Sequence, residues 1–338
     1  MMYPWHQTAW QALNLANLPH ALLLHGPQGI GKTDFAFTLA QTLLCESLSA
    51  HTRACGECQA CSWFMQSNHP DLMMVRPQNL EKENAAAIAD EQPKKEKSSS
   101  QEIRLEQIQA LITFANIGSH RGKRKVILLY PVETLNIYAA NALLKILEEP
   151  PSQVIFILLS HHIERVLPTL LSRCQQLRLA MPNQQQALEW LNNKNIDNAL
   201  EILSYAGGSP LQALAASQDE NNRYIYQFLP EQLGKGKALA DLDLAEGLHK
   251  HDLHMVLQGV QRWAYDLLSI RLTQSVRYYP SYKNTLQKIA PLVNLFALLK
   301  FLLSLQTQQK YITHPLAPKL LLESTFVEYR NLFNTQPN

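Results

Sequence analysis

The sequence has 338 residues, a mass of 38.4 kDa and 46% hydrophobic residues, so it has room for two or three domains with large buried cores. Only 17% of the residues are charged, which argues against a chain that is disordered throughout. The formal net charge of +2 excludes a uniformly basic nucleic-acid-binding protein, so any such contact has to come from a local patch.

The first seventeen residues lack the basic stretch and continuous apolar run of a secretory signal. No window reaches the ~18 uninterrupted apolar residues that a membrane helix needs. We therefore expect a soluble, cytoplasmic protein.

Short apolar runs alternate with segments of helical spacing through the first half of the chain. This alternation predicts an α/β fold with a parallel sheet, whose ligands bind beyond the carboxyl ends of the strands. The expected strands are 21–25, 72–75, 126–129 and 154–159, and the clearest helices are 34–44, 105–114 and 139–147.

The composition then changes twice along the chain. Residues 78–101 are rich in Glu, Lys, Ala, Pro and Ser, which predicts a mobile surface insertion. After Pro182 the strand-like runs end and apolar residues recur every three or four positions, which predicts an all-helical second half. The expected domains are an α/β domain over 1–178, a small helical domain over 179–222 and a helical domain over 223–338.

A glycine-rich segment follows the first expected strand and fits the phosphate-binding pattern G-x-x-x-x-G-K-[ST]. Gly26, Gly29 and Gly31 allow backbone N–H groups to surround a phosphate chain. Lys32 would reach the β and γ phosphates, and Thr33 would hold Mg²⁺. We therefore predict a nucleotide-binding P-loop, and the alternative is an ordinary glycine turn between a strand and a helix.

Hydrolysis also needs an acidic residue where a neighbouring strand ends. Strand 126–129 is followed by Tyr130 and Pro131, and the first carboxylate, Glu133, comes a few residues late. We expect the Glu133 side chain to point elsewhere, so the pattern indicates a nucleotide-binding fold that has lost hydrolysis.

Four of the five cysteines lie within seventeen residues, at 45–61, which is too clustered for a disulfide scaffold. Cys45, Cys55, Cys58 and Cys61 can place four sulfurs around one Zn²⁺, and Gly56 allows a tight turn between them. Such a zinc is structural because protein fills all four positions. The flanking His51 and His69 are expected to be surface residues, and unrelated thiols or a redox pair are the alternatives.

These motifs, in this order, resemble the AAA+ subunits of the bacterial clamp loader of DNA polymerase III. The resemblance covers about residues 1–215 by motif. It rests on H-A-L-L-L-H-G-P-Q-G-I-G-K-T at 20–33, the cysteine cluster, N-A-L-L-K-I-L-E-E-P-P at 141–151 and L-L-S-R-C at 170–174. By itself, the S-R-C segment would be only a short polar break with an exposed arginine.

The resemblance implies that Arg173, with Ser172 beside it, is an arginine finger that reaches the ATP of a neighbouring subunit. It also implies a five-membered ring with gamma/tau-type motor subunits and a delta-type clamp-opening subunit, which loads the sliding clamp onto primed DNA. The small helical domain then acts as a lid and the last domain as a collar that joins subunits. No independent catalysis is expected from this chain, which would belong to a nucleotidyltransferase holoenzyme.

Departures from the family pattern indicate which kind of subunit this is. A motor subunit has an Asp-Glu pair where Tyr130 and Pro131 stand and a threonine near Ser160 and His161. It also has an arginine after the Gly-Ser of its lid, where this chain has Leu211. The resemblance therefore favours a non-hydrolysing stator, with bound ATP and Mg²⁺ left open.

Two further groups of residues are candidates for contacts with partners. Direct DNA contact could come from Arg121, Lys123, Arg124 and Lys125, which could equally be a solvated strand entry. Apolar residues for a collar are Phe296, Leu298, Leu299, Phe301 and Leu302, which could equally form a private core.

Two alternatives to the stator remain. An active ATPase motor of the same ring would need Glu133 or another acid to replace the missing pair. A P-loop small-molecule kinase with a zinc insertion would need a basic lid and a substrate acid over the phosphates, which the helical last third disfavours.

Overall fold

The structure is a computed structural model that describes residues 2–47, 53–80, 100–120, 124–310 and 318–334. The chain forms two compact units, Met1–Pro182 and Asn183–Asn338, which are described separately. Among the described residues no single helix is long and apolar enough to cross a membrane, and only the pair Pro280–Leu292 and Leu295–Gln309, bent by 114°, passes that test together.

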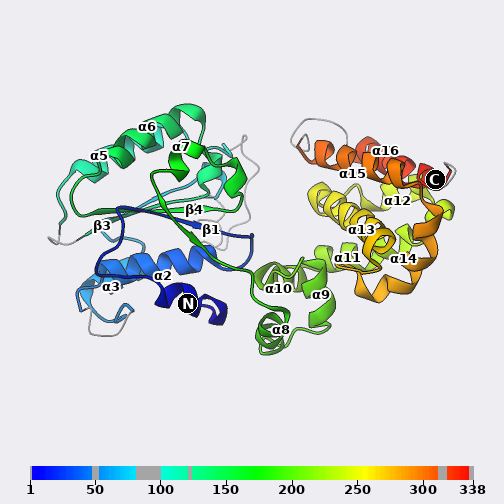
Figure 1. The fold of residues 1–338 in the computed structure, drawn as a ribbon, viewed down its shortest axis with the longest axis horizontal. Helices are drawn as coiled ribbons and strands as arrows, with labels where there is room; N and C mark the ends of the chain where they lie inside the picture. The colour runs from blue at the N-terminus through cyan, green and yellow to red at the C-terminus, as the bar shows by residue number, and fades with distance from the viewer. Residues whose placement is uncertain (1, 48–52, 81–99, 121–123, 311–317, 335–338) are drawn as a thin grey trace. The chain divides into compact units, whose positions relative to one another are not determined.

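The first unit is built on a five-stranded sheet in which every pair of neighbouring strands is parallel (Figure 1). The strand order is β2-β3-β4-β1-β5. The strands are β1 (Ala21–His25), β2 (Leu72–Val75), β3 (Lys125–Leu129), β4 (Val154–Ser160) and β5 (Gln175–Arg178). This confirms the predicted parallel α/β fold, to which the structure adds β5.

Successive side chains of each central strand enter opposite layers of the core. In β1, Leu23 packs into one apolar cluster, whereas Leu22 and Leu24 pack into the other. The sheet is thus buried on both faces, which explains why its strands are continuous apolar runs. Figure 1 shows α5 and α6 on one side of the sheet and α2 on the other. The helices whose bounds the structure describes in this unit are α1 (Gln7–Gln11), α2 (Lys32–Leu44), α3 (Gln59–Met65), α5 (Leu105–Asn116), α6 (Ile137–Glu148) and α7 (Pro168–Leu171).

The predicted insertion at 78–101 falls mostly outside the described residues, which omit 81–99. At its described ends, the backbone N–H of Asn79 donates to the carbonyl of Ser100 at 3.4 Å. The loop therefore begins and ends at neighbouring positions of the first unit.

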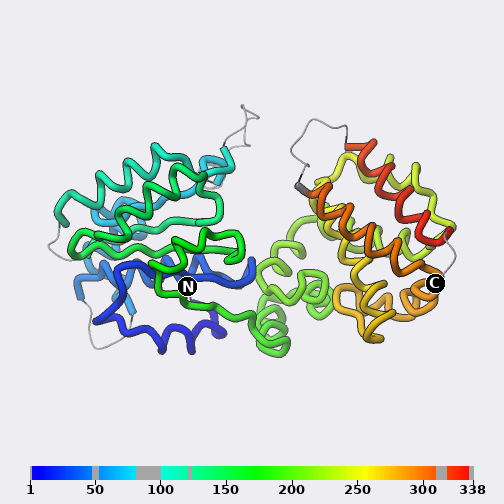
Figure 2. Tube along the Cα trace, turned by 45° about the horizontal axis from the view of Figure 1, so that its top comes forward, coloured from blue at the N-terminus to red at the C-terminus, as the bar shows by residue number. Residues whose placement is uncertain are grey.

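The second unit contains only helices and turns among its described residues, as the sequence predicted. One apolar cluster lies among α8–α10 and a larger one among α11–α16, and Figure 2 shows the chain passing from the first group to the second. The helices are α8 (Gln184–Asn192), α9 (Ala199–Tyr205), α10 (Pro210–Gln218), α11 (Glu220–Leu233), α12 (Asp241–Leu248), α13 (Leu253–Thr273), α14 (Lys283–Ile289), α15 (Leu295–Lys310) and α16 (Pro318–Asn331). A boundary near 222 remains a prediction.

A buried carboxylate organises the loop that follows α13. Asp266 accepts hydrogen bonds from the backbone N–H groups of Arg277, Tyr278 and Tyr279 at 2.8–3.2 Å. Burial raises the pKa of this carboxyl, and the three N–H groups act in the opposite direction. They supply the partners that a buried carboxylate requires.

Candidate nucleotide and metal sites

The P-loop follows β1 directly and leads into α2, as predicted. Gly29 and Gly31 have φ angles of 75° and 84°, in the left-handed region that favours glycine. Two glycines also lack room for a side chain. A Cβ on Gly26 would lie 2.2 Å from the carbonyl oxygen of Leu179, and one on Gly31 would lie 2.2 Å from the ring of Tyr3. Packing alone thus explains part of the glycine pattern.

Lys32 is 2% exposed, and its ammonium group donates to the carbonyl oxygens of Gly26 (2.7 Å) and Pro27 (2.5 Å). Burial lowers its pKa to about 8, and the negative charge of Glu133 acts in the opposite direction. The lysine is therefore held within the loop, where a phosphate would compete with these carbonyl groups for its protons.

An aromatic segment before α1 packs on the same loop. The Tyr3 ring stacks on Trp5 with ring centroids 4.9 Å apart, and the indole N–H of Trp5 donates to the carbonyl of Ile30 at 2.9 Å. Burial, with a smaller effect of the Asp34 carboxylate, raises the pKa of Tyr3 to about 12. Buried His6 packs edge-on against Phe35 of α2. This aromatic segment therefore packs on the P-loop and on α2, and its contacts stabilise the conformation of the loop.

The position of Glu133 differs from the expectation. It lies on a short turn after β3, and its Oε1 accepts a hydrogen bond from the backbone N–H of His161 at 2.9 Å, just beyond β4. The carboxylate interacts electrostatically with Lys32. The prediction that this side chain points elsewhere was wrong, because the turn at 132–134 directs the carboxylate toward the residue that follows β4. Tyr130 packs edge-on against Phe37, and its hydroxyl accepts from Arg76.

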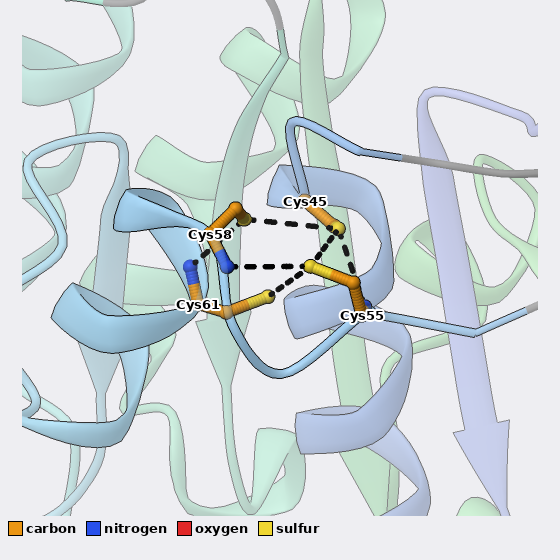
Figure 3. A group of neighbouring side chains, drawn as sticks. All are labelled: Cys45, Cys55, Cys58 and Cys61. Atoms are coloured by element: carbon orange, nitrogen blue, oxygen red, sulfur yellow. Dashed lines mark hydrogen bonds between the residues drawn. The ribbon is translucent and has the colours of Figure 1, made fainter.

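The four cysteines come together as predicted (Figure 3). All four Sγ atoms lie within 4.8 Å of one another, with separations of 3.6 Å for Cys45–Cys55 and 3.9 Å for Cys45–Cys58 and Cys55–Cys61. Four sulfurs in tetrahedral bonds of ~2.3 Å to one zinc ion stand about 3.8 Å apart. The cluster can therefore hold a metal ion.

Backbone geometry supports the cluster. Gly56 has a φ angle of 79°, as the tight turn requires, and the N–H groups of Cys55, Cys58 and Cys61 each donate to a neighbouring Sγ at 3.4–3.5 Å. Burial acts to raise the pKa of Cys58, but hydrogen bonds from backbone N–H groups and neighbouring thiols lower it to about 6. Burial raises the pKa of Cys61. A cation would favour the thiolate at all four positions.

His69 is not part of the cluster that the described residues form. His69 is buried, packs edge-on against Trp63 and accepts a hydrogen bond at Nδ1 from the N–H of Asp71 at 3.1 Å. The prediction of a surface residue was therefore wrong for His69, whose ring closes the turn before β2. His51 lies outside the described residues.

Arg173 follows α7 and is bound to the end of α6. Its Nε donates to Glu148 Oε1 at 2.9 Å, and Nη2 contacts the same oxygen. Nη1 donates to the carbonyl of Thr169 at 2.9 Å and to Ser172 Oγ at 3.3 Å. The side chain is 32% exposed. The L-E-E-P-P and S-R-C segments are thus in direct contact through Glu148 and Arg173.

Two of the four proposed DNA-contact residues are used inside the protein. Lys125 is buried, and its ammonium group donates to the carbonyls of Phe114 and Ile117 at 2.7 and 2.8 Å, at the end of α5. Arg124 donates to the carbonyls of Leu15 and Ala16. The sequence predicted either a DNA contact or a solvated strand entry for Lys125. Its buried position agrees with neither. Arg121 and Lys123 lie outside the described residues.

Comparison with known proteins agrees with this arrangement. The family described as "DNA polymerase III, delta subunit" matches residues 6–183. A protein named DNA polymerase III subunit delta' from Pseudomonas aeruginosa is 40% identical over 80% of this chain and 79% of its own length. The chain belongs to the DNA polymerase III delta' family. The Escherichia coli protein of the same name is 31% identical over 65% of this chain and 62% of its own length.

Proteins with other names also match this chain. DNA polymerase III subunit tau from Salmonella typhimurium is 30% identical over 62% of this chain, which is 30% of its own length. A gamma-subunit-related protein from Thermotoga maritima aligns over 97% of this chain and 99% of its own, at 15% identity and a TM-score of 0.44.

Sequence reasoning missed two contacts: the one between Glu148 and Arg173, and the one between Glu133 and His161 beside the P-loop. Their partners lie 25 and 28 positions away in the sequence. The only available signal was their place at a helix end and after two adjacent strands.

Proposed function

We propose that this protein is a stator subunit of the DNA polymerase III clamp loader, which loads the sliding clamp onto primed DNA in the cytoplasm. Its neighbours in the ring would be gamma/tau-type motor subunits and a delta-type clamp-opening subunit. Membership of the delta' family and the similarity to subunit tau support this assignment. Tyr130 and Pro131, in place of an acidic pair, support a role without its own hydrolysis.

The observation that carries the proposal is the arrangement of Arg173. Its hydrogen-bond partners are Glu148, Thr169 and Ser172, none of which belongs to the P-loop of its own chain. A partly exposed guanidinium of this kind can reach a phosphate on a neighbouring subunit and stabilise the charge that develops there. Arg173, with Ser172 beside it, is then an arginine finger that acts in trans.

The test is ATP turnover by the reconstituted ring on primed DNA, with this chain as the only variable. Arg173→Ala is expected to lower turnover by about 10³-fold, the size typical of an arginine finger. Arg165→Ala, which removes an exposed arginine from the same unit, is the matched control. Full turnover with Arg173→Ala in an assembled ring contradicts the proposal.

The cofactors form a second part of the proposal. The cysteine cluster binds a structural Zn²⁺ through Cys45, Cys55, Cys58 and Cys61, which the sulfur separations support. The P-loop keeps a nucleotide cradle formed by Gly26, Gly29, Gly31, Lys32 and Thr33. Zinc content of the purified chain, measured by atomic emission, tests the first statement, and one ion per chain is expected.

The helical unit is proposed to supply a lid over 179–222 and a subunit-joining collar over 223–338. Phe296, Leu299 and Leu303 are 65%, 43% and 63% exposed, and their spacing of three and four places them on one face of α15. Leu298 and Phe301, by contrast, are buried in the unit's own core. The exposed face supports a contact with other subunits.

An active ATPase of the same ring is the second candidate, and the position of Glu133 beside Lys32 favours it. Turnover by the isolated chain separates the two functions. The stator predicts no turnover, whereas a motor predicts turnover that Lys32→Ala abolishes.

A further inference from the structure

Three segments that follow adjacent strands meet beside the P-loop. β4 pairs with β1 on one side and with β3 on the other, and all three strands are parallel. The P-loop, Glu133 and His161 follow β1, β3 and β4 respectively. Their side chains therefore gather at the carboxyl ends of these three strands, where α/β folds bind their ligands. We call this end of the strands the edge of the sheet.

Two polar atoms at this edge are buried and have no hydrogen-bond partner in the described part of the chain. Glu133 Oε1 accepts from the His161 N–H, but Oε2 accepts nothing, and Nδ1 of the His161 ring is likewise unsatisfied. A buried polar group without a partner destabilises the folded chain, and more so when it carries a charge. Such atoms point to a partner that is bound in the working protein.

The charges at this edge match a metal-bound polyphosphate. Lys32 is the cation and Glu133 the anion, and the two interact with each other. Burial and the charge of Lys32 lower the pKa of His161 to about 4, although Glu133 acts in the opposite direction. The unsatisfied Nδ1 of the ring can donate to or accept from a ligand, according to its tautomer.

We propose that Glu133 and His161 complete the P-loop as a binding site for a magnesium nucleoside triphosphate. Lys32 would exchange the carbonyls of Gly26 and Pro27 for phosphate oxygens. The Glu133 carboxylate and the Thr33 hydroxyl are the oxygen ligands that Mg²⁺ prefers. The His161 ring nitrogen would bond to a phosphate oxygen. This inference rests on the nucleotide cradle of the proposed function, to which it adds the acidic group and the imidazole.

The inference explains how the site can bind without an acidic pair at the strand end. The positions after β3 hold Tyr130 and Pro131, so Glu133 is the carboxylate that the fold brings to Lys32. Its Oε1 is fixed by a backbone N–H, which orients Oε2. The arrangement supplies a ligand for the cation and makes no demand on hydrolysis.

The test is calorimetric titration of the full chain with ATP, once with Mg²⁺ and once with EDTA. For the wild type, Mg²⁺ is expected to tighten ATP binding about tenfold through the carboxylate. In Glu133→Gln the ratio of the two affinities should fall to about one, with ATP binding in EDTA equal or tighter because a negative charge is gone. The ratio distinguishes a cation ligand from a residue that only supports the fold.

Glu164→Gln is the matched control, because it removes an exposed carboxylate near the end of β4 that pairs with His162. It should retain the wild-type ratio. His161→Gln should weaken ATP binding in both buffers and leave the ratio unchanged. Thermal unfolding of each variant checks that the first unit is folded.

The outcomes separate this inference from the proposed function. A wild-type ratio in folded Glu133→Gln overturns the role of Glu133, while the cradle and the stator stand. Absence of ATP binding by the wild type overturns both the cradle and this inference. The trans role of Arg173 does not depend on either result.

Discussion

The cysteine cluster and the proposed nucleotide site at the P-loop, Glu133 and His161 lie in the same unit, but their residues are brought together in different ways. The four cysteines lie within seventeen residues, on the end of α2, the start of α3 and the loop between them. The proposed nucleotide site takes its groups from three strand ends, which follow His25, Leu129 and Ser160 in the sequence. A site made by one loop can be predicted from spacing, whereas a site made by a sheet needs the strand order.

The two sites also differ in what holds them without a ligand. Backbone N–H groups reach the sulfurs, and a cation would further stabilise four thiolates so close together. The P-loop is already held by the Lys32 ammonium and by the Tyr3–Trp5 stack. We therefore expect the cysteine module to depend on its ion for folding and the P-loop to keep its shape alone.

Loss of the metal should give the largest change. Ligation of zinc stabilises isolated zinc-finger peptides by ~10–16 kcal/mol, and part of that is expected here because α2 and α3 are also held by packing. Cys61→Ser should lose the bound ion and lower the melting temperature of the first unit by several degrees, as should a chelator. Calorimetry measures both effects.

Cys174→Ser is the control, because Cys174 is buried outside the cluster. It should keep one zinc per chain. If the chelator leaves the melting temperature of the wild type unchanged, the cysteine module does not depend on a metal ion for folding.

Gly31→Ala should destabilise the first unit by about 4 kcal/mol, because it combines a left-handed backbone with overpacking. Its Cβ would lie 2.2 Å from the Tyr3 ring. Urea unfolding measures the loss, and Tyr3→Ala in the same chain should recover the part that comes from the clash. Gly118→Ala, where nothing lies within 4 Å, should change little. Equal losses at both glycines would show that the aromatic segment does not hold the loop.

The third largest effect is expected from acid, which should weaken the packing of His6 against Phe35. Burial lowers the pKa of His6 to about 4, from an ordinary value of 6.5. The unfolded chain therefore binds a proton between pH 6.5 and 4 that the folded chain does not, so stability falls as the pH drops through this window. The loss approaches about 3 kcal/mol for one such group.

In urea unfolding at pH 7 and pH 4.5, His6→Gln should narrow the difference between the two free energies of unfolding. His20→Gln, at an exposed position of the same unit, should not. An unchanged difference in His6→Gln would assign the acid sensitivity to other groups, of which His161 is one.

Glu148→Gln should give the smallest effect. Without the carboxylate, Arg173 must be ordered when it binds, which costs about 0.5–1.5 kcal/mol for a long side chain. Turnover of the assembled ring should fall by roughly two- to tenfold by that reasoning. Glu149→Gln removes the neighbouring carboxylate and should have no effect. A rise in turnover with Glu148→Gln would mean that the carboxylate competes with the phosphate for the guanidinium.

The sequence predicted the fold where burial leaves a continuous apolar run. The strand at 21–25 was predicted at its observed bounds, because both faces of a central strand are buried. β5 was missed, since Gln-Gln-Leu-Arg at a sheet edge offers one apolar residue. Helix 139–147 was found, but it begins two residues earlier, where Asn136 caps it through its side chain.

Charge was the weakest guide to the sites. Lys125 looked like part of a basic patch, yet its ammonium group binds carbonyl groups at the end of α5. Glu133 looked too late in the sequence for a site, yet a short turn returns it to the next strand. Both errors have the same cause, because a side chain's direction depends on tertiary neighbours that spacing along the chain does not encode.

The loop after α13 shows what an anion can do when it belongs to the chain. Three consecutive amide groups converge on the Asp266 carboxylate, much as the amides of a P-loop converge on phosphate. One loop carries its anion covalently and is complete at every nucleotide concentration, whereas the P-loop, under the function proposed above, takes its anion from solution. The same backbone chemistry would then serve once as permanent architecture and once as a binding site for a diffusing ligand.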